Sequence, residues 1–250
     1  MDSKGQFGLL YTEDFSVACA ISYLKQEDVL QYFINRVSFY AFNGGEMEAV
    51  ALWATRIIVD CKENYQAEVT PANDRRIQRI FFKYISLLSD LMENTHFSTV
   101  DKMKESLYIM QDWEAEMMPF ADFPKTLYLS EELSLVLTFD FNLLCRINGL
   151  NPQEVLQYFI DSISLARDRA LNVISFVGTD ASMSLFAMMK LSRSMKQHKL
   201  PVQQDIHEWY NEKLLALDET LREEPDMALR ISAYRKLYSE WYNTLRRNLN

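Results

Sequence analysis

One segment of this chain occurs twice. Residues 9–38 read again without a gap as residues 135–164, at an offset of about 126 residues. Because that offset is roughly half of the 250-residue chain, it is too long for the common solenoid repeats and indicates a duplicated half of the protein. The repeat therefore predicts two pseudo-symmetric halves that share one architecture.

Each copy of the repeat begins with a short run of apolar, β-prone residues. The runs at 9–12 and 133–139 indicate a short strand at the start of each half. Asp14 and Asp140 follow these runs, and their carboxylates are suited to cap the first turn of a helix. Gly149 is a typical helix C-cap residue, so a first helix is expected to end there in the second copy, with another helix after it.

The two copies are identical over the sequence VLQYFI, at 29–34 and 155–160. At about 100° per residue its apolar side chains share one helix face, and the glutamines point away from that face. Two interpretations follow: both helices pack in equivalent internal sites, or they present two equivalent contact points to a partner. The candidate partner-surface residues are Gln31, Tyr32, Gln157 and Tyr158.

Beyond residue 38 the copies diverge, but the order of helical patterns persists. Helical patterns begin near residue 46, after Thr70 and at the capping box of Ser98, and their counterparts begin near residues 179, 201 and 225. Each half therefore reads as a strand followed by about five helices. The helix that Thr70 and Pro71 open is expected to carry an apolar stripe of Ile77, Ile80, Phe81, Tyr84, Ile85, Leu88 and Leu91.

A proline-containing stretch separates the two halves. It includes Pro119 and Pro124, so it cannot form one continuous helix, and its apolar side chains predict that it packs against the protein. We expect a first helical half-repeat at 1–118, a linker at 119–130 and a second half-repeat at 131–250. The predicted fold class is a mainly α, internally duplicated helical protein with one short strand at the start of each half.

The charge and the cysteines restrict the partners and the compartment. A net charge of −9 disfavours wrapping of nucleic acid, because Lys and Arg supply most of that affinity. No apolar run is long enough for a membrane span, so we expect a soluble cytoplasmic protein with no membrane partner. Cys19, Cys61 and Cys145 lack metal-binding spacing and are interpreted as buried, reduced thiols.

The sequence contains no recognisable catalytic, cofactor or metal motif. His207 and Glu208 begin an HExxH pattern, but Asn211 stands where the second histidine is required. Paired carboxylates such as Glu27 and Asp28 fall at predicted helix ends, where the helix dipole accounts for them. We therefore expect no enzymatic activity, no cofactor and no metal.

Two cationic clusters are candidates for an anion-binding patch. The first lies at the start of the helix after Pro71, where positive charge opposes the helix dipole, and the second lies at the end of a later helix. A solvated helix face is the alternative interpretation of both clusters. The candidate residues are Arg75, Arg76, Arg79, Lys83, Lys190, Arg193, Lys196 and Lys199.

These features favour a non-enzymatic interaction or regulatory module that binds another protein or a second copy of itself. As an alternative, the order of strand, capped helix, turn and capped helix in each copy resembles the ribbon-helix-helix family, which implies paired strands and a DNA-associated regulator. Here the residues that alternate with Leu133, Leu135 and Leu137 offer no cation for base readout. A third interpretation is a small-ligand binder or enzyme with a cleft between the halves.

Overall fold

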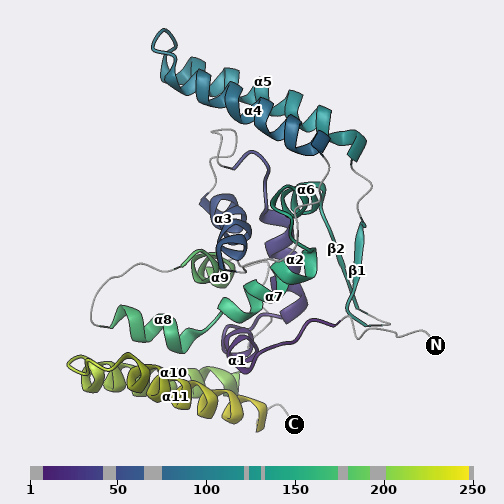
Figure 1. Cartoon of the computed structure of the whole chain (residues 1–250). Coiled ribbons are helices and arrows are strands. Elements are labelled where there is room, and N and C mark those ends of the chain that lie inside the picture. Colours follow the sequence, from purple (N-terminus) through teal and green to yellow (C-terminus); the bar gives the residue numbers. More distant parts are fainter. Residues whose placement is uncertain are drawn as a thin grey trace. The chain divides into compact units, whose positions relative to one another are not determined.

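The computed structural model describes residues 8–41, 49–64, 75–120, 124–130, 133–173, 180–191 and 201–247. Over these residues the protein is mainly helical, as predicted, with eleven α-helices, one short 3-10 helix and two short strands (Figure 1). The chain divides into two compact units. Unit 1 comprises Met1–Leu9 and Gln31–Leu156, and unit 2 comprises Leu10–Leu30 and Gln157–Asn250, so each unit contains residues from both predicted halves.

Unit 1 contains the elements of the middle of the chain. They are the end of α2 (Gln26–Arg36), α3 (Ala49–Asn64), α4 (Arg75–Glu93), α5 (Thr99–Met117), the 3-10 helix η1 (Met118–Phe120), β1 (Thr126–Tyr128), β2 (Ser134–Val136), α6 (Phe139–Asn148) and the start of α7 (Pro152–Ser162).

Unit 2 contains the remaining elements. They are α1 (Glu13–Ile21), the start of α2, the end of α7, α8 (Leu165–Asn172), α9 (Ala181–Leu191), α10 (Pro201–Leu221) and α11 (Met227–Arg247).

The ends of several helices follow from local chemistry. Gly149 adopts φ 70°, the left-handed conformation expected of a C-cap, and Ser98 accepts a hydrogen bond from the Asp101 amide at the start of α5. The N-caps of α1 and α6 are Thr12 and Thr138. The prediction that Asp14 and Asp140 cap these helices is wrong, because both carboxylates accept hydrogen bonds from tertiary partners instead.

The strand expected within 133–139 is present as β2, and it pairs antiparallel with β1, with Leu127 opposite Leu135. The strand expected at 9–12 is not formed, since the described backbone there has no strand partner. A strand requires a paired edge, and alternating apolar residues alone do not supply one. The ribbon-helix-helix pattern implies that the strands of the two repeat copies pair with each other. That implication is wrong for β2, because β2 pairs with β1.

The apolar face of each VLQYFI helix is fully buried. Phe33 meets Phe141 edge to face in unit 1, with 5.7 Å between ring centroids. The buried members of the two copies are Val29, Leu30, Phe33, Ile34, Val155, Leu156, Phe159 and Ile160. Burial of these side chains contributes to the stability of the fold.

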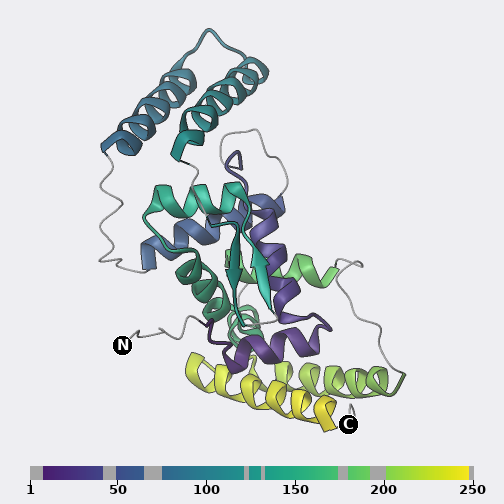
Figure 2. The same ribbon diagram turned by 90° about the vertical axis from the view of Figure 1, so that its right-hand side faces the viewer.

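Helices α4 and α5 form a helical hairpin in unit 1, and they lie side by side in both views (Figures 1 and 2). The buried indole of Trp113 joins this hairpin to the rest of the unit. It stacks on Tyr84 at 5.6 Å and meets Phe39 edge to face at 4.9 Å, and Leu143 of α6 completes the cluster. The helix start expected at Thr70 lies outside the described residues.

Helices α10 and α11 form a second helical hairpin, in unit 2. The Trp241 indole stacks on Tyr210 at 5.4 Å, and α1 and α8 pack against α11. Val17 of α1 and Ala166 of α8 belong to the same buried cluster. This hairpin is therefore held by aromatic stacking and by two helices from elsewhere in the chain.

The predicted linker is not a continuous helix, and its described part packs against α6. Arg146 Nη1 donates to the Phe120 carbonyl at 2.8 Å, and Asn142 Nδ2 donates to the Pro124 carbonyl at 3.1 Å. Both prolines interrupt the helical hydrogen-bond pattern, which explains why α5 gives way to η1 and then to β1.

Candidate functional site

The two glutamines of the VLQYFI helices bind the main chain of extended segments. Gln31 donates to the Val136 carbonyl and accepts from the Val136 amide, both at 2.8 Å. Gln157 does the same with Leu10, with both bonds at 2.9 Å. Each glutamine side-chain amide therefore satisfies the main-chain N–H and C=O of one residue, as a paired strand would. A role of these glutamines in binding a partner stays a prediction.

The tyrosines next to these glutamines are half-buried. The Arg36 guanidinium lies 5.0 Å from the centre of the Tyr32 ring, and the Tyr158 carbonyl accepts a hydrogen bond from the Ser162 hydroxyl at 2.7 Å. Tyr32 and Tyr158 thus have structural neighbours as well as some exposed surface.

The candidate anion-binding residues fall in both units. Arg75, Arg76 and Arg79 are exposed on α4, whereas Lys83 forms an ion pair with Glu116 at 2.6 Å. Lys190 is near the end of α9 in unit 2. The other three residues, Arg193, Lys196 and Lys199, lie outside the described residues. A combined anion patch therefore stays a prediction.

Helix α4 carries a second apolar stripe, which is exposed. Phe82, Ile85 and Met92 are 69 %, 43 % and 53 % exposed. They lie about 100° further round the helix than the stripe that α4 buries. Ile85 belongs to the predicted apolar stripe but is exposed, because the neighbouring helix covers only part of so wide an apolar surface.

Helix α5 has a matching exposed stripe that includes Val100 and Met103. Viewed from the N-terminus of α5, this stripe also lies about 90° clockwise from the buried side of the helix. Because α4 and α5 run antiparallel and face each other, the same clockwise offset places both exposed stripes on one side of the hairpin. Lys102 Nζ donates to the Met92 carbonyl at 2.6 Å, which places the ends of the two stripes side by side. We call Phe82, Ile85, Met92, Val100 and Met103 the hairpin apolar face. The 3.6-residue helical period would have revealed this face if the apolar residues of α4 had been assigned to two separate stripes.

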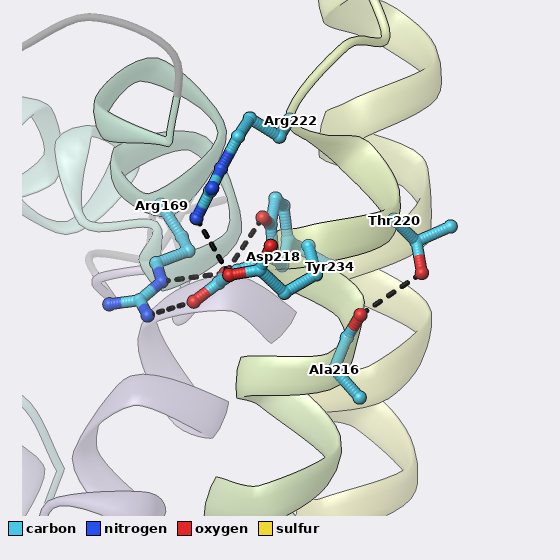
Figure 3. Close-up of polar contacts among 7 residues, drawn as sticks. Arg169, Ala216, Asp218, Thr220, Arg222 and Tyr234 are labelled. Atoms are coloured by element: carbon cyan, nitrogen blue, oxygen red, sulfur yellow. Dashed lines mark hydrogen bonds and ion pairs between the residues drawn. The ribbon is translucent and has the colours of Figure 1, made fainter.

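A partly buried carboxylate joins three helices of unit 2 (Figure 3). Asp218 of α10 accepts a two-pronged interaction from Arg169 of α8 and a 2.9 Å hydrogen bond from the hydroxyl of Tyr234 of α11. The hydrogen bond to Asp218 raises the pKa of Arg169, while burial and then this hydrogen bond raise the pKa of Tyr234. Both groups stay protonated at neutral pH, so the network is suited to holding helices together.

Arg230 of α11 is a buried cation without a counterion among the described residues. Arg230 is only 5 % exposed, and its Nη2 atom contacts the Met227 sulfur at 3.5 Å. Its Nε and Nη1 atoms have no hydrogen-bond partner in the described structure. A buried guanidinium that lacks a carboxylate lowers the stability of the fold.

We therefore expect Arg230→Met to raise the free energy of unfolding by about 1 to 2 kcal/mol, because methionine keeps much of the side-chain volume and removes the charge. Urea unfolding of the full chain measures the change. The matched control is Arg235→Met on the same helix, which removes the ion pair with Asp14 and is expected to lower stability. A loss of stability in Arg230→Met would show that the buried charge has a stabilising partner.

An open groove of about 370 Å³ runs between α10 and α11, with Lys213 and Lys236 among its lining residues. Within the described ranges, no group of His, Cys, Asp and Glu could hold a metal ion, and no helix there is long and apolar enough to cross a membrane.

All three cysteines are buried and carry free thiols. Burial raises the pKa of Cys61 to about 12 and raises the pKa values of Cys19 and Cys145 well above the usual range. The thiolate is the reactive form of cysteine. All three cysteines are therefore unreactive toward thiol reagents for two reasons: reagents cannot reach them, and they stay protonated.

At pH 8 we expect each native thiol to react with a disulfide reagent at least about 10³-fold more slowly than a free cysteine. Labelling followed by mass spectrometry measures the rates, and the same reagent in guanidinium should label all three. Fast labelling of even one thiol in the folded chain would contradict the burial described here.

The chain matches no known protein family, and no curated protein or solved structure is significantly similar to it. Its function is therefore inferred from its own residues and their geometry.

Proposed function

We propose that this protein is a non-catalytic interaction module that binds a protein partner through the hairpin apolar face. The observation that carries the proposal is the exposure of large apolar side chains along one side of α4 and at the start of α5. Single exposed apolar residues are common, but a contiguous apolar stripe in contact with water is unfavourable and marks interaction sites.

The residue types support an adaptable surface. The hairpin apolar face contains two methionines and a phenylalanine, which are side chains that fit varied partners and are frequent at the centre of interfaces. The remainder of α4 and α5 is well anchored, since Trp113 and Met110 are buried within the unit 1 core. A rigid hairpin can present this face without losing much conformational entropy on binding.

A photocrosslinking experiment tests the proposal. Phe82 is replaced by p-benzoylphenylalanine in the full chain, and the same replacement at Asp112, which is exposed on the opposite side of α5, is the matched control. Irradiation in cells that express the chain is expected to give discrete protein adducts from position 82 and none from position 112. No adduct at position 82, or the same adducts from both positions, would overturn the proposal.

We also infer that the chain arose by duplication, with each copy contributing to both compact units. The supporting observations lie at the offset of the sequence repeat or within two residues of it. Gln31 binds Val136 as Gln157 binds Leu10, and in each pair the two residues come from different copies. The stacked Tyr84 and Trp113 have their counterpart in the stacked Tyr210 and Trp241.

If the two glutamines are equivalent, Gln31→Met and Gln157→Met should each lower the free energy of unfolding by a similar amount, about 1 kcal/mol. Methionine retains the length of the side chain and removes both hydrogen bonds to the main chain. Gln153→Met, at a half-buried position of α7, is the control and should have little effect. Strongly unequal losses in the two variants would count against equivalent roles.

A further inference from the structure

We propose that the groove between α10 and α11 binds an amphipathic helix of a partner protein, one that carries carboxylates beside its apolar stripe. This inference goes beyond the proposed function, because the hairpin apolar face belongs to unit 1 and the groove belongs to unit 2. It is carried by the apolar lining of the groove, by a lysine on each wall and by exposed apolar residues beyond both ends.

The lining of the groove suits a helix better than an extended peptide. It includes Ala216 and Leu217 of α10 and Ala233 and Leu237 of α11. The hydroxyl of Thr220, which also lines the groove, donates to the Ala216 carbonyl at 3.0 Å, so this polar group is satisfied within α10 (Figure 3). An extended peptide would leave main-chain groups unpaired above such a lining, whereas a helix satisfies its own main chain, and the two alanines allow it to approach closely.

Two exposed apolar residues continue this surface beyond the ends of the groove. Trp209 of α10 and Leu229 of α11 are 50 % and 56 % exposed, and both lie on the groove side of their helices. In the antiparallel register that the hydrogen bond between Tyr234 and Asp218 shows, they are about 15 residues, or about 22 Å, apart along the hairpin. A partner helix of about four turns therefore reaches both residues.

Each wall of the groove carries a lysine. Lys213 belongs to α10 and Lys236 to α11, and neither forms an ion pair in the part of the chain that the structure describes. The Lys213 ammonium lies 3.6 Å from the centre of the Trp209 ring, a contact that does not neutralise its charge. Glu240 is the one acid in the described lining, so the two lysines leave the groove with net positive charge. Carboxylates beside the apolar stripe of a partner are complementary to this charge.

The other acids of α10 do not change this pattern. Glu208, Glu212 and Glu219 are exposed, but they lie about 90 to 130° round α10 from the middle of the groove wall. At the repeat offset, Lys213 and Ala216 correspond to Leu87 and Asp90 of α4. A helical hairpin of this kind therefore does not require a cation and a small residue at these positions.

Fluorescence anisotropy with two labelled peptides tests the inference. Both peptides are helices of about 15 residues with the same leucine stripe, flanked by glutamates in one and by lysines in the other. The purified full chain should bind the acidic peptide at least about tenfold more tightly than the basic one, although its net charge of −9 favours the opposite order. Lys236→Glu should weaken binding of the acidic peptide at least about tenfold, and Glu240→Gln should strengthen it about threefold.

Two further variants locate the bound peptide. Ala216→Trp fills the groove and should abolish binding, whereas Leu215→Trp, at a 61 % exposed residue on another side of α10, should leave it unchanged; circular dichroism verifies that each variant is folded. A dissociation constant above about 0.1 mM for the acidic peptide, equal binding of both peptides, or unchanged binding by Lys236→Glu would overturn the inference. The proposed function is tested separately, because adducts from position 82 report on α4 in unit 1.

Discussion

Replacing Trp113 by alanine is expected to lower the free energy of unfolding by about 3 to 5 kcal/mol. The indole is buried and contacts the rings of Tyr84, Phe39 and Phe81, with centroid distances of 5.6, 4.9 and 5.5 Å. Its removal leaves a large cavity between the α4–α5 hairpin and the rest of unit 1, because neighbouring rings can only partly close such a space. Urea unfolding followed by far-ultraviolet circular dichroism measures the loss.

Trp209→Ala is the matched control for this prediction. Trp209 is half exposed, and its indole contacts the Lys213 ammonium at 3.6 Å, so its truncation should cost about 1 kcal/mol or less. Trp113→Phe should lie between wild type and alanine, since it keeps a buried ring. Equal losses in Trp113→Ala and Trp209→Ala would mean that Trp113 does not anchor the hairpin.

Asp218→Ala is expected to lower the free energy of unfolding by about 2 to 4 kcal/mol. The substitution leaves the Arg169 guanidinium without its carboxylate, and it leaves the hydroxyl of fully buried Tyr234 without its acceptor. The Arg169 contribution is limited, because that side chain is 40 % exposed and water can replace part of the interaction. Most of the loss should therefore come from the Tyr234 hydroxyl and from the contacts that hold α8, α10 and α11 together.

The neighbouring residue supplies the control. Glu219 pairs with Arg222 at the exposed surface, so Glu219→Ala should change the free energy of unfolding by about 0.5 kcal/mol or less. Asp218→Asn keeps an oxygen acceptor for Tyr234 and removes the charge, and its loss should be smaller than that of Asp218→Ala. If Asp218→Ala is as stable as Glu219→Ala, the buried network does not stabilise unit 2.

Local signals in the sequence predicted the features that depend on a few neighbouring residues. Gly149 ends α6 because a residue without a side chain tolerates positive φ, and Ser98 begins α5 because its hydroxyl accepts an orphan amide. Thr12 and Thr138 were overlooked as caps. Both are suitable residue types, but the choice between them and the nearby aspartates depends on which side chains have other partners, such as Ser164 for Asp14.

The candidate site was predicted less well, because exposure is not a local property. The predicted apolar stripe of α4 includes Ile85, yet Ile85 is exposed, and so is Phe82, which the stripe left out, since α5 covers only part of the helix. Gln31 and Gln157 were singled out by the repeat, and both bind the main chain of an extended segment. Their hydrogen bonds to Val136 and Leu10 join residues more than a hundred positions apart, and no local pattern indicates such partners.

The sequence by itself determined that the chain is mainly helical, where several helices begin and end, and that the VLQYFI helices share one apolar face, because these properties follow from hydrophobic periodicity and capping within one or two turns. Only the tertiary structure decided which apolar stripe of α4 stays in water, which residue binds each aspartate, and that β2 pairs with β1. Each of these outcomes depends on competition among groups that are distant in the chain, so it is settled by packing rather than by local sequence.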